Sequence, residues 1–266
     1  MISSIVSHLP EDFPWKGSIH YFETIDSTNT RAKQLAPQGA PHGTVLIADS
    51  QTGGRGRMGR SFHSPAGSGI YLSVILRPQC RASELMHLTC ATGVAMCDAV
   101  QDSCSFRPGI KWTNDLVLGK RKLGGILTEL SLDAQGNAAY AVVGIGINCT
   151  QDISDFPEDI RNIATSLKLS TQHSIDRSQV IASMLIQLEA MSNILLRQKA
   201  QIMAQYRRDC ITVGQEISVI AGETIRHGTA LSVDEEGALI VRFSDGHTEA
   251  VSSGEVSVRG MYGYIS

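Results

Sequence analysis

The sequence predicts a mixed α/β fold followed by a small all-β module. Over roughly the first 210 residues, strand-like apolar runs are interleaved with segments of helical period, which is typical of helices packed on a mixed sheet. Beyond about residue 214 the pattern changes to short runs in which apolar and polar residues alternate. We therefore divide the chain into one domain over residues 1–212 and a second over residues 213–266.

Five strands are expected in the first domain. The segment up to about Gly17 has no clear period, and the polar cluster Ile25–Thr30 supplies N-cap residues for a short helix over 31–35. Apolar runs bounded by turn residues follow. The strands they predict cover residues 44–50, 70–77, 110–118, 122–132 and 139–148.

Two longer helices complete the first domain. Residues 83–101 and 178–210 carry apolar side chains at helical spacing. Cys90, Cys97 and Cys104 recur every seven residues, which indicates the packed side of the first helix rather than a metal site. The six cysteines form no C-x-x-C pair, so we expect reduced thiols that take no part in chemistry.

The second domain is expected to be a small β-barrel or roll. Its alternating runs cover residues 217–220, 228–231, 238–241 and 255–258. Glu236-Gly237 and Asp245-Gly246 lie between these runs and favour tight hairpin turns.

The bulk composition narrows the function classes. Of 266 residues, 42% are hydrophobic and 18% are charged, as in ordinary globular proteins, and the net charge is -3. This mildly acidic balance argues against nucleic acid as a partner. The sequence shows no signal peptide and no apolar run of membrane-spanning length, so we expect a cytoplasmic protein without a membrane partner.

Residues 53–60, G-G-R-G-R-M-G-R, place three arginines among four glycines directly after a predicted strand. The guanidinium fork of arginine matches carboxylate and phosphate oxygens, and glycine lets the backbone approach a ligand closely. We interpret this arginine loop as a binding element for a small anionic ligand, which orders the loop when it binds.

Two well-known nucleotide motifs fit the arginine loop by letter. Gly54 begins a G-x-G-x-x-G dinucleotide fingerprint, and the same stretch resembles a phosphate loop with Arg60 at the lysine position. Both motifs must be followed directly by a helix, whereas residues 61–69 are rich in helix-breaking glycine and proline. We therefore disfavour both, and a solvated basic loop without a ligand stays open at this point.

Three more segments carry candidate functional residues. They are K-W-T-N-D at residues 111–115, K-L-G-G-I at 122–126 and G-I-G-I-N at 144–148. Taken singly, each has a structural alternative: Asp115 as a turn residue, Lys122 as a solvated lysine, and the two glycines of the last segment as accommodations for packing.

Taken in order, the motifs resemble those of biotin–protein ligases over nearly the whole chain. The matching segments are D-S-T-N, Q-x-x-G-R-G-R-x-G-R, K-W-x-N-D-L, R-K-L-x-G-I-L and G-x-G-I-N. The resemblance implies a mixed-sheet biotinyl/lipoyl protein ligase catalytic domain with a Src-homology-like barrel after it. It also implies an ATP- and Mg²⁺-dependent biotin–[acetyl-CoA-carboxylase] ligase, which makes biotinyl-5′-AMP and transfers biotin to a lysine of the biotin carboxyl carrier protein.

The resemblance further implies roles for individual residues. Lys122, Arg57 and Arg55 match positions at the reacting groups, and Asp115 matches a metal-associated position. Residues matching the biotin pocket are Ser27, Thr28, Asn29, Gln51, Arg55, Gly56, Arg57, Lys122 and Gly125. Residues matching the ATP site are Arg57, Arg60, Phe62, Lys111, Asn114, Asn148 and Arg259.

These residue types suit the reaction. A carboxylate must attack the α-phosphate of ATP, and two unit charges 4 Å apart repel by about 4 kcal/mol at an effective dielectric constant near 20. Lys122, the loop arginines and Mg²⁺ would offset that repulsion. Positioning and electrostatic stabilisation would then supply the acceleration without a protein nucleophile.

The chain departs from the family pattern at a few points. Thr113 stands where the family usually has proline, and Phe62 where an indole often covers the adenine. The D-S-T-N cluster begins only 25 residues from the start, so we expect the monofunctional form without a DNA-binding domain. A lipoate–protein ligase and a non-catalytic biotin sensor remain the alternatives, and a homodimer is one option for assembly.

Overall fold

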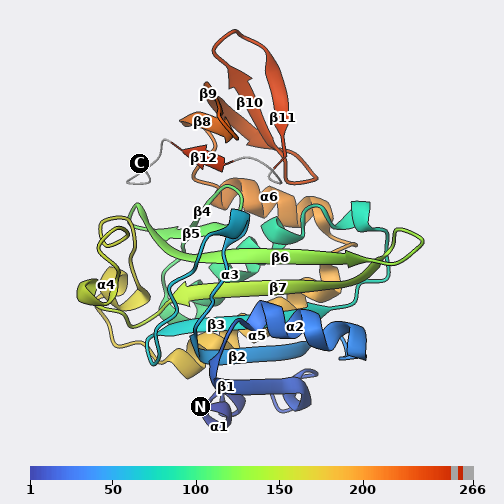
Figure 1. The fold of residues 1–266 in the computed structure, drawn as a ribbon, viewed down its shortest axis with the longest axis vertical. Helices are drawn as coiled ribbons and strands as arrows, with labels where there is room; N and C mark the ends of the chain where they lie inside the picture. The colour runs from blue at the N-terminus through green and yellow to red at the C-terminus, as the bar shows by residue number, and fades with distance from the viewer. Residues whose placement is uncertain (253–256, 260–266) are drawn as a thin grey trace.

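The computed structural model describes residues 1–252 and 257–259, and its larger part is built on a seven-stranded mixed sheet (Figure 1). The strand order is β1-β2-β3-β7-β6-β5-β4; β1 pairs parallel with β2, and every other neighbouring pair is antiparallel. The strands are β1 (Ile19–Ile25), β2 (Thr44–Gln51), β3 (Gly69–Leu76), β4 (Gly109–Lys111), β5 (Asp115–Leu118), β6 (Arg121–Leu132) and β7 (Ala138–Asn148). The predicted mixed α/β class is confirmed.

Four of the five predicted strands agree with β2, β3, β6 and β7 to within one residue at each end. The prediction of one strand over 110–118 was wrong, because Lys111 pairs with Asp115 and the chain reverses between them to form the hairpin β4–β5. Strand β1 was missed, since its residues alternate between partly buried and exposed without a continuous apolar run.

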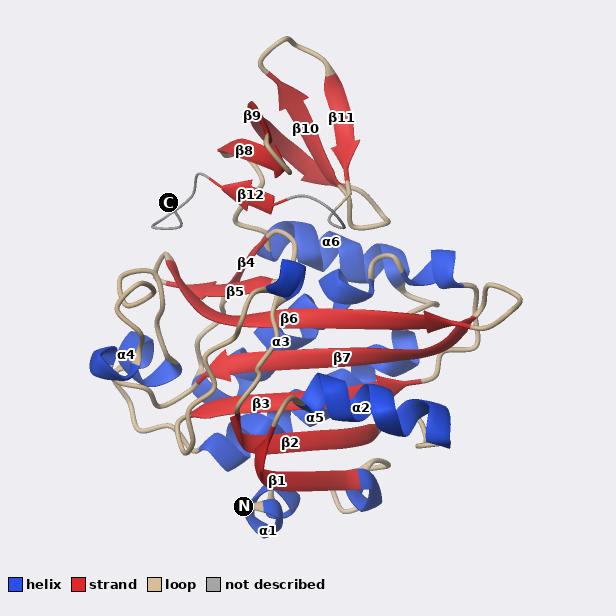
Figure 2. Cartoon of the chain, viewed as in Figure 1, coloured by secondary structure: helices blue, strands red, loops and turns tan. Residues whose placement is uncertain are grey.

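Helices cover both faces of the sheet (Figure 2). Helix α3 (Leu88–Cys104) packs against α5 (Arg177–Ile194) and α6 (Lys199–Asp209) on one face. Helix α2 (Thr28–Leu35) lies on the opposite face, against β2, β3 and β7. Two short helices are α1 (Ile2–Ser7) and α4 (Leu167–Thr171). The 3-10 turns are Lys16–Ser18, Ala36–Gln38, Arg57–Gly59, Ala82–Leu85 and Ile153–Asp155.

The two long helices differ from the prediction in their continuity. The segment 83–101 begins as a 3-10 turn, and α3 itself starts only at Leu88. The segment 178–210 is two helices, α5 and α6, although no glycine or proline interrupts it. At the break, the buried His87 ring donates from Nε2 to the Leu195 carbonyl at 3.0 Å. A tertiary contact therefore takes up a carbonyl that the end of α5 leaves without a helical partner.

Strand alternation divides the core into two unequal parts. Along β3, Ile70, Leu72 and Val74 face the main core under α3 and α5, and Ile75 faces a small cluster under α2. That small cluster consists of Ala32, Ala36, Leu46, Ile75 and Val142. Burying each of its larger side chains, Leu46, Ile75 and Val142, contributes about 1.5–3 kcal/mol. On the α2 face, the sheet beyond this cluster carries small residues, including Ser73 and its pairing partner Gly144.

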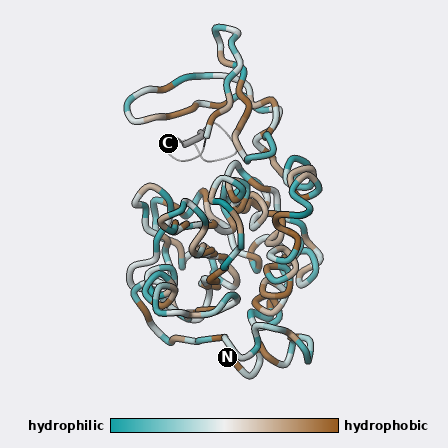
Figure 3. The backbone as a smooth tube through the Cα atoms, turned by 90° about the vertical axis from the view of Figure 1, so that its right-hand side faces the viewer, coloured by the Kyte–Doolittle hydropathy of each residue, from teal (hydrophilic) through white to brown (hydrophobic). Residues whose placement is uncertain are grey.

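The C-terminal part is a five-stranded antiparallel sheet that stands at one end of the molecule (Figure 3). Its strands are β8 (Glu216–Ala221), β9 (Thr224–Val233), β10 (Leu239–Phe243), β11 (Thr248–Val251) and β12 (Ser257–Arg259), in the order β11-β10-β9-β8-β12. Gly237 and Gly246, at the predicted hairpin turns, have φ values of +86° and +90°. Glycine occupies this left-handed region without steric cost.

The remaining sequence expectations concern cysteines and membranes. Cys80, Cys90, Cys97, Cys104, Cys149 and Cys210 are all free thiols. Cys90 and Cys97 are buried in α3, as their seven-residue spacing predicted. Within the described residues, none of the helices has the length and apolar character needed to cross a membrane.

Candidate active site

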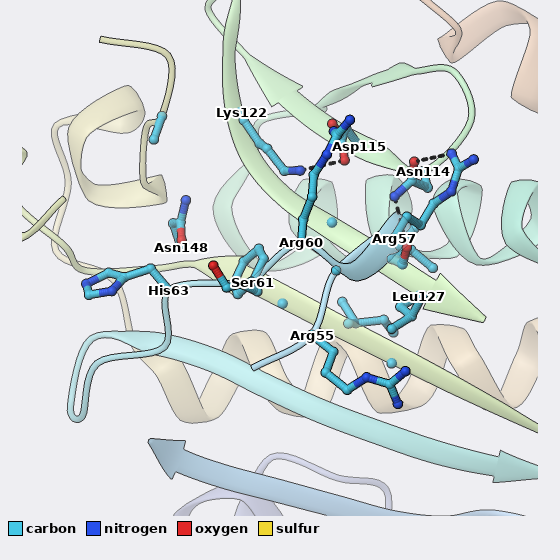
Figure 4. Close-up of a pocket in the computed structure, with 18 of the residues that line it drawn as sticks. Arg55, Arg57, Arg60, Ser61, His63, Asn114, Asp115, Lys122, Leu127 and Asn148 are labelled. Carbon is cyan, nitrogen blue, oxygen red and sulfur yellow. Dashed lines mark hydrogen bonds and ion pairs between the residues drawn. The ribbon is translucent and has the colours of Figure 1, made fainter. Parts of the chain in front are cut away.

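The predicted site residues converge on one pocket of about 290 Å³ (Figure 4). It lies beside the first turn of α2, on the same face of the sheet as that helix. The predicted residues that line it are Ser27, Thr28, Asn29, Gln51, Arg55, Gly56, Arg57, Arg60, Phe62, Lys111, Asn114, Asp115, Lys122, Gly125 and Asn148. Segments more than 100 residues apart in the chain are thus brought together. The prediction for the Arg259 side chain lies outside the described residues.

One end of the pocket is a buried network of neutral side chains. Ser27 caps α2 and places Thr28 and Asn29 on its first turn. The backbone N–H and the hydroxyl of Thr28 both donate to Gln51 Oε1, at 2.8 and 3.1 Å. Ser73 Oγ lies 2.7 Å from Thr28 Oγ1 and donates to Asn29 Oδ1 at 2.6 Å. Each side chain therefore fixes the orientation of its neighbour.

The carboxylate of Glu129 borders this network. Glu129, on β6, accepts hydrogen bonds from Asn29 Nδ2 at 3.0 Å and from Lys33 Nζ at 2.7 Å, and it lies 3.3 Å from Arg55 Nη1. Burial alone would raise the pKa of the Glu129 carboxyl. The hydrogen bonds from Lys33 and Asn29 and the charge of Arg55 outweigh burial and hold that pKa below its ordinary value.

The arginine loop is a small hairpin with its own hydrogen bonds. Gly56 N donates to Arg60 O at 2.7 Å, and Phe62 N donates to Gly54 O at 2.9 Å. Residues 60–68 continue without a helix, so the dinucleotide and phosphate-loop patterns carry no structural meaning here. A loop that lines the pocket also differs from a merely solvated basic segment.

The three loop arginines lie differently. Arg57 is partly buried and donates to Asn114 Oδ1 at 3.0 Å, which links the loop to the β4–β5 turn. Burial lowers the pKa of the Arg57 guanidinium, with Asp115 opposing that shift and Arg60 adding to it. In Figure 4, Arg57 and Arg60 extend toward Asn114 and Asp115, whereas Arg55 extends the other way. The loop thus directs cations to two different parts of the pocket.

The other end of the pocket is charged. Lys122 Nζ donates to Asp115 Oδ1 at 2.7 Å, and these two side chains are 31% and 19% exposed. The backbone of Lys122 is fixed by its pairing with the segment 163–165, through bonds of 2.7 and 2.8 Å. Lys111 is buried in the same pocket, and Asn148 donates to Thr165 O at 3.0 Å. The charged groups thus stand on strands and tight turns rather than on free chain.

Hydrogen bonds with α6 and the C-terminal part support the turn that carries Asn114 and Asp115. Trp112 N donates to Thr212 Oγ1, and Trp112 Nε1 donates to Gly237 O, both at 2.9 Å. Tyr206 donates from its hydroxyl to Thr113 O at 3.1 Å. Helix α6 and the β9–β10 turn of the C-terminal sheet therefore both support this end of the pocket.

The glycines of the 144–148 motif make room for the chain's own side chains. A Cβ atom on Gly144 would lie 1.9 Å from Asn29 Oδ1, and one on Gly146 would lie 2.6 Å from the Phe62 ring. Any larger residue at either position would displace the side chain that covers it. The packing interpretation of this pair is therefore supported, although both glycines also line the pocket.

Several lining residues were not foreseen. Ser73 and Glu129 were also not foreseen; they do not line the pocket themselves but hydrogen-bond to the lining residue Asn29. The apolar wall formed by Phe156, Ile160, Ile163 and Ala164 comes from a loop with no distinctive pattern. Among residues 1–252 and 257–259, no group of three or more His, Cys, Asp or Glu side chains is placed to hold a metal ion.

Comparison with known proteins finds a family match in both the N-terminal and the C-terminal parts of the chain. Residues 21–148 match the Biotin/lipoate A/B protein ligase family, and residues 212–259 match the Biotin protein ligase C terminal domain. The Biotin--[acetyl-CoA-carboxylase] ligase of Mycobacterium tuberculosis is 34% identical, with 86% of this chain and 85% of that protein covered. The chain belongs to the biotin protein ligase family.

Other members resemble it to a similar degree. The Bifunctional ligase/repressor BirA of Bacillus subtilis is 33% identical over 85% of this chain and 70% of its own length. Among solved structures, the biotin protein ligase of Aquifex aeolicus in complex with biotin and ATP has 30% identity and a TM-score of 0.77, covering 91% of this chain and 98% of that one. The family fold therefore extends over both parts of the molecule.

Proposed function

We propose that this protein is an ATP-dependent biotin–[acetyl-CoA-carboxylase] ligase. It joins biotin to ATP as biotinyl-5′-AMP with release of pyrophosphate, and then transfers the biotinyl group to one lysine of a biotin carboxyl carrier protein. The observation that carries the proposal is the pocket itself. It joins a buried, neutral hydrogen-bonding end to an end built from Lys111, Lys122 and arginines.

The neutral end suits the ring system of biotin. A ureido group presents two N–H donors and one carbonyl acceptor, and such a group is bound best by fixed polar side chains in a dry site. Ser27, Thr28, Asn29 and Gln51 supply those groups. The bonds between Thr28 and Gln51 and the bond from Ser73 to Asn29 fix these side chains in advance, which limits the entropy lost on binding. Gly56 and Gly125 let the ligand lie close to the backbone.

The charged end suits the reacting groups. The biotin carboxylate oxygen forms a bond to the α-phosphorus while the bond to the pyrophosphate oxygen breaks. Lys122 and Arg57 neutralise the charge on the approaching carboxylate and phosphate, and Arg55 contributes from the biotin side. Arg60, Phe62, Lys111, Asn114 and Asn148 are assigned to the nucleotide, as is Arg259.

In the second step the carrier lysine amine attacks the biotinyl carbonyl and AMP leaves. The product is an amide, and the proton of the attacking amine must be lost as the bond forms. A catalytic side chain that becomes covalently modified is not needed, since the adenylate is already activated. The six free cysteines have no role in this mechanism.

A magnesium ion would be bound by one carboxylate and the phosphates. Mg²⁺ characteristically retains several waters and uses one or two carboxylates with substrate phosphates, so Asp115 alone meets the requirement on the protein side. The ion would neutralise phosphate charge. Asp115 and Lys122 are in contact, so the carboxylate also keeps the lysine directed into the pocket before substrates bind.

We further propose that residues 1–212 and 213–266 are separate domains, that the protein acts in the cytoplasm, and that it uses neither nucleic acid nor membrane as a partner. A homodimer is compatible with this activity. The boundary is supported by the element order, since α6 ends at Asp209 and the first strand of the C-terminal sheet begins at Glu216, with six residues between them.

The decisive experiment is carrier labelling. The purified protein, incubated with biotin, ATP and Mg²⁺, should add one biotin to a single lysine of a folded carrier domain, as measured by intact mass and peptide mapping. Lipoate in place of biotin tests the alternative of a lipoate–protein ligase. Failure to attach biotin to a carrier that a known ligase labels under the same conditions would contradict the proposal. Labelling with lipoate would then favour the lipoate–protein ligase, and no labelling with either would leave the biotin sensor.

A further inference from the structure

The carboxylate of Glu129 lies where the neutral network meets the arginine loop. Its side chain is 22% exposed and contacts three residues on two elements: Asn29 and Lys33 on α2, and Arg55 on the loop. The neutral end of the pocket requires no acid for hydrogen bonding, because Ser73 and Leu127 O already bond the Asn29 side chain. The charge on Glu129 therefore calls for another explanation.

An ionised carboxylate only accepts hydrogen bonds, and this fixes the Asn29 amide. Asn29 Nδ2 donates to Glu129 Oε2 at 3.0 Å and to Leu127 O at 3.2 Å. Its Oδ1 is left to accept from Ser73 at 2.6 Å. A flipped amide would place two acceptors against each other at Glu129, at a cost of about 1–3 kcal/mol for the unsatisfied buried group.

The same carboxylate holds one side of the arginine loop. Arg55 is 44% exposed and lies 3.3 Å from Glu129 Oε1, whereas Arg57 is bonded on the opposite side to Asn114. The loop is therefore attached to the body of the protein at two points, one at each end of the pocket. A glycine-rich loop has many open conformations, so even one partly exposed ion pair changes its closed fraction.

We propose that Glu129 is a positioning residue that orients Asn29 toward biotin and, through Arg55, tethers the arginine loop over the same pocket. The proposal rests on the proposed function for the identity of the ligand, but the tether belongs to the protein without ligand. Lys33 is the third partner of the carboxylate and lies outside the pocket lining, so it offers a matched control.

The tether can be measured without substrates, because Arg57 and Arg60 are sites for trypsin in the loop. The variants are Glu129→Gln, which keeps an acceptor for Asn29 but removes the charge, Arg55→Met, and the control Lys33→Met. In the full ligand-free chain we expect cleavage after Arg57 or Arg60 to be about fivefold faster in Glu129→Gln and Arg55→Met. Lys33→Met should stay within about twofold of wild type, since it leaves the Arg55 contact in place.

The double variant Arg55→Met/Glu129→Gln tests whether the two residues act through their mutual contact. If the two residues act through one contact, cleavage in the double variant is no faster than in Arg55→Met alone. Wild-type cleavage rates in both single variants, with melting temperatures showing that they are folded, would overturn the proposal. Equally faster cleavage in Lys33→Met would also overturn the proposal, because loss of any charge near Glu129, and not of the Arg55 contact in particular, would then open the loop. If Glu129→Gln fails to fold, Arg55→Met still decides the outcome.

Steady-state kinetics separates positioning from general structural support. Glu129→Gln should raise KM for biotin about fivefold and leave kcat within about twofold, because Glu129 touches no reacting atom. Glu129→Leu, which also removes the acceptor for Asn29, should raise KM further. Equal losses in kcat for both variants would contradict a positioning role. A wild-type protein that biotin neither stabilises nor protects from trypsin would instead contradict the proposed function, and the ligand-free cleavage rates would still test the tether.

Discussion

The two ends of the pocket are built on opposite principles. At the neutral end, which we assign to biotin, Thr28, Asn29 and Ser73 are buried and joined by short contacts. At the charged end, which we assign to the nucleotide, Lys122 and Asp115 form a partly exposed ion pair, and Arg57 reaches across from a glycine-rich loop. A neutral ring is best recognised by a network of neutral donors and acceptors, whereas a reacting phosphate is stabilised by cations aimed at its developing charge.

This contrast predicts that substitutions at the two ends affect different steps. Changes at the neutral end should act on KM for biotin, because that network orients a part of the ligand that does not react. Changes at the charged end should act on the adenylation rate or on retention of the adenylate.

Replacing Lys122 by alanine should produce the largest loss. We expect the rate of pyrophosphate release to fall by about 10²–10³, as when one donor to developing charge is removed. The fold should persist, because the backbone pairing of Lys122 with residues 163–165 does not involve the side chain. Release of pyrophosphate at nearly the wild-type rate, in a variant of unchanged melting temperature, would show that the charged end is not the reacting end.

Replacing Arg57 by glycine should affect retention more than synthesis. The variant loses the bond to Asn114 that joins the loop to the β4–β5 turn, so the loop should open over the adenylate. Biotin incorporation into serum albumin should rise about tenfold over wild type when both proteins are compared at equal adenylate-forming activity. Equally low labelling by both proteins would show that Arg57 does not fasten the loop.

Replacing Ser73 by alanine tests the neutral end. Asn29 Oδ1 would lose its donor in a buried site, at a cost of about 1–3 kcal/mol, part of which falls on biotin binding. We expect KM for biotin to rise about five- to tenfold with kcat for adenylation nearly unchanged. Thr89→Ala, on α3 at the back of the sheet, removes a hydroxyl of similar size outside the pocket and serves as the control. A loss confined to kcat would contradict the assignment of this end to binding.

The smallest effect is a pH dependence of stability at the border between the two ends. The pKa of the Glu129 carboxyl lies below its ordinary value of 4.5 in the folded protein, so its contribution to stability is present above that value. It is lost as the pH falls through the folded pKa. The difference in melting temperature between wild type and Glu129→Gln should therefore shrink below about pH 4.5, and a difference that grows toward low pH would have the wrong sign.

The sequence predicted the pocket residues better than the elements that hold them. The motif residues stand at strand ends and in tight turns, so short patterns of glycine, asparagine and charge mark them without knowledge of the fold. Ser73 and Glu129 lie in the middle of strands and have no such local mark. The importance of Ser73 depends on the register that places it opposite Gly144, 71 positions away, and that of Glu129 on contacts with α2 and the arginine loop.

Local patterns were enough to identify the chemical groups, since the arginines, Lys122 and the order of the motifs define what can be bound. Which of these groups meet could be seen only in the fold. The helix predicted over 178–210 ends where His87 bonds Leu195 O, and the chain reverses between Lys111 and Asp115 with support from Thr212 and Gly237. Local patterns set side-chain type and periodicity, whereas breaks, registers and ion pairs such as Glu129 with Arg55 depend on partners distant in the chain.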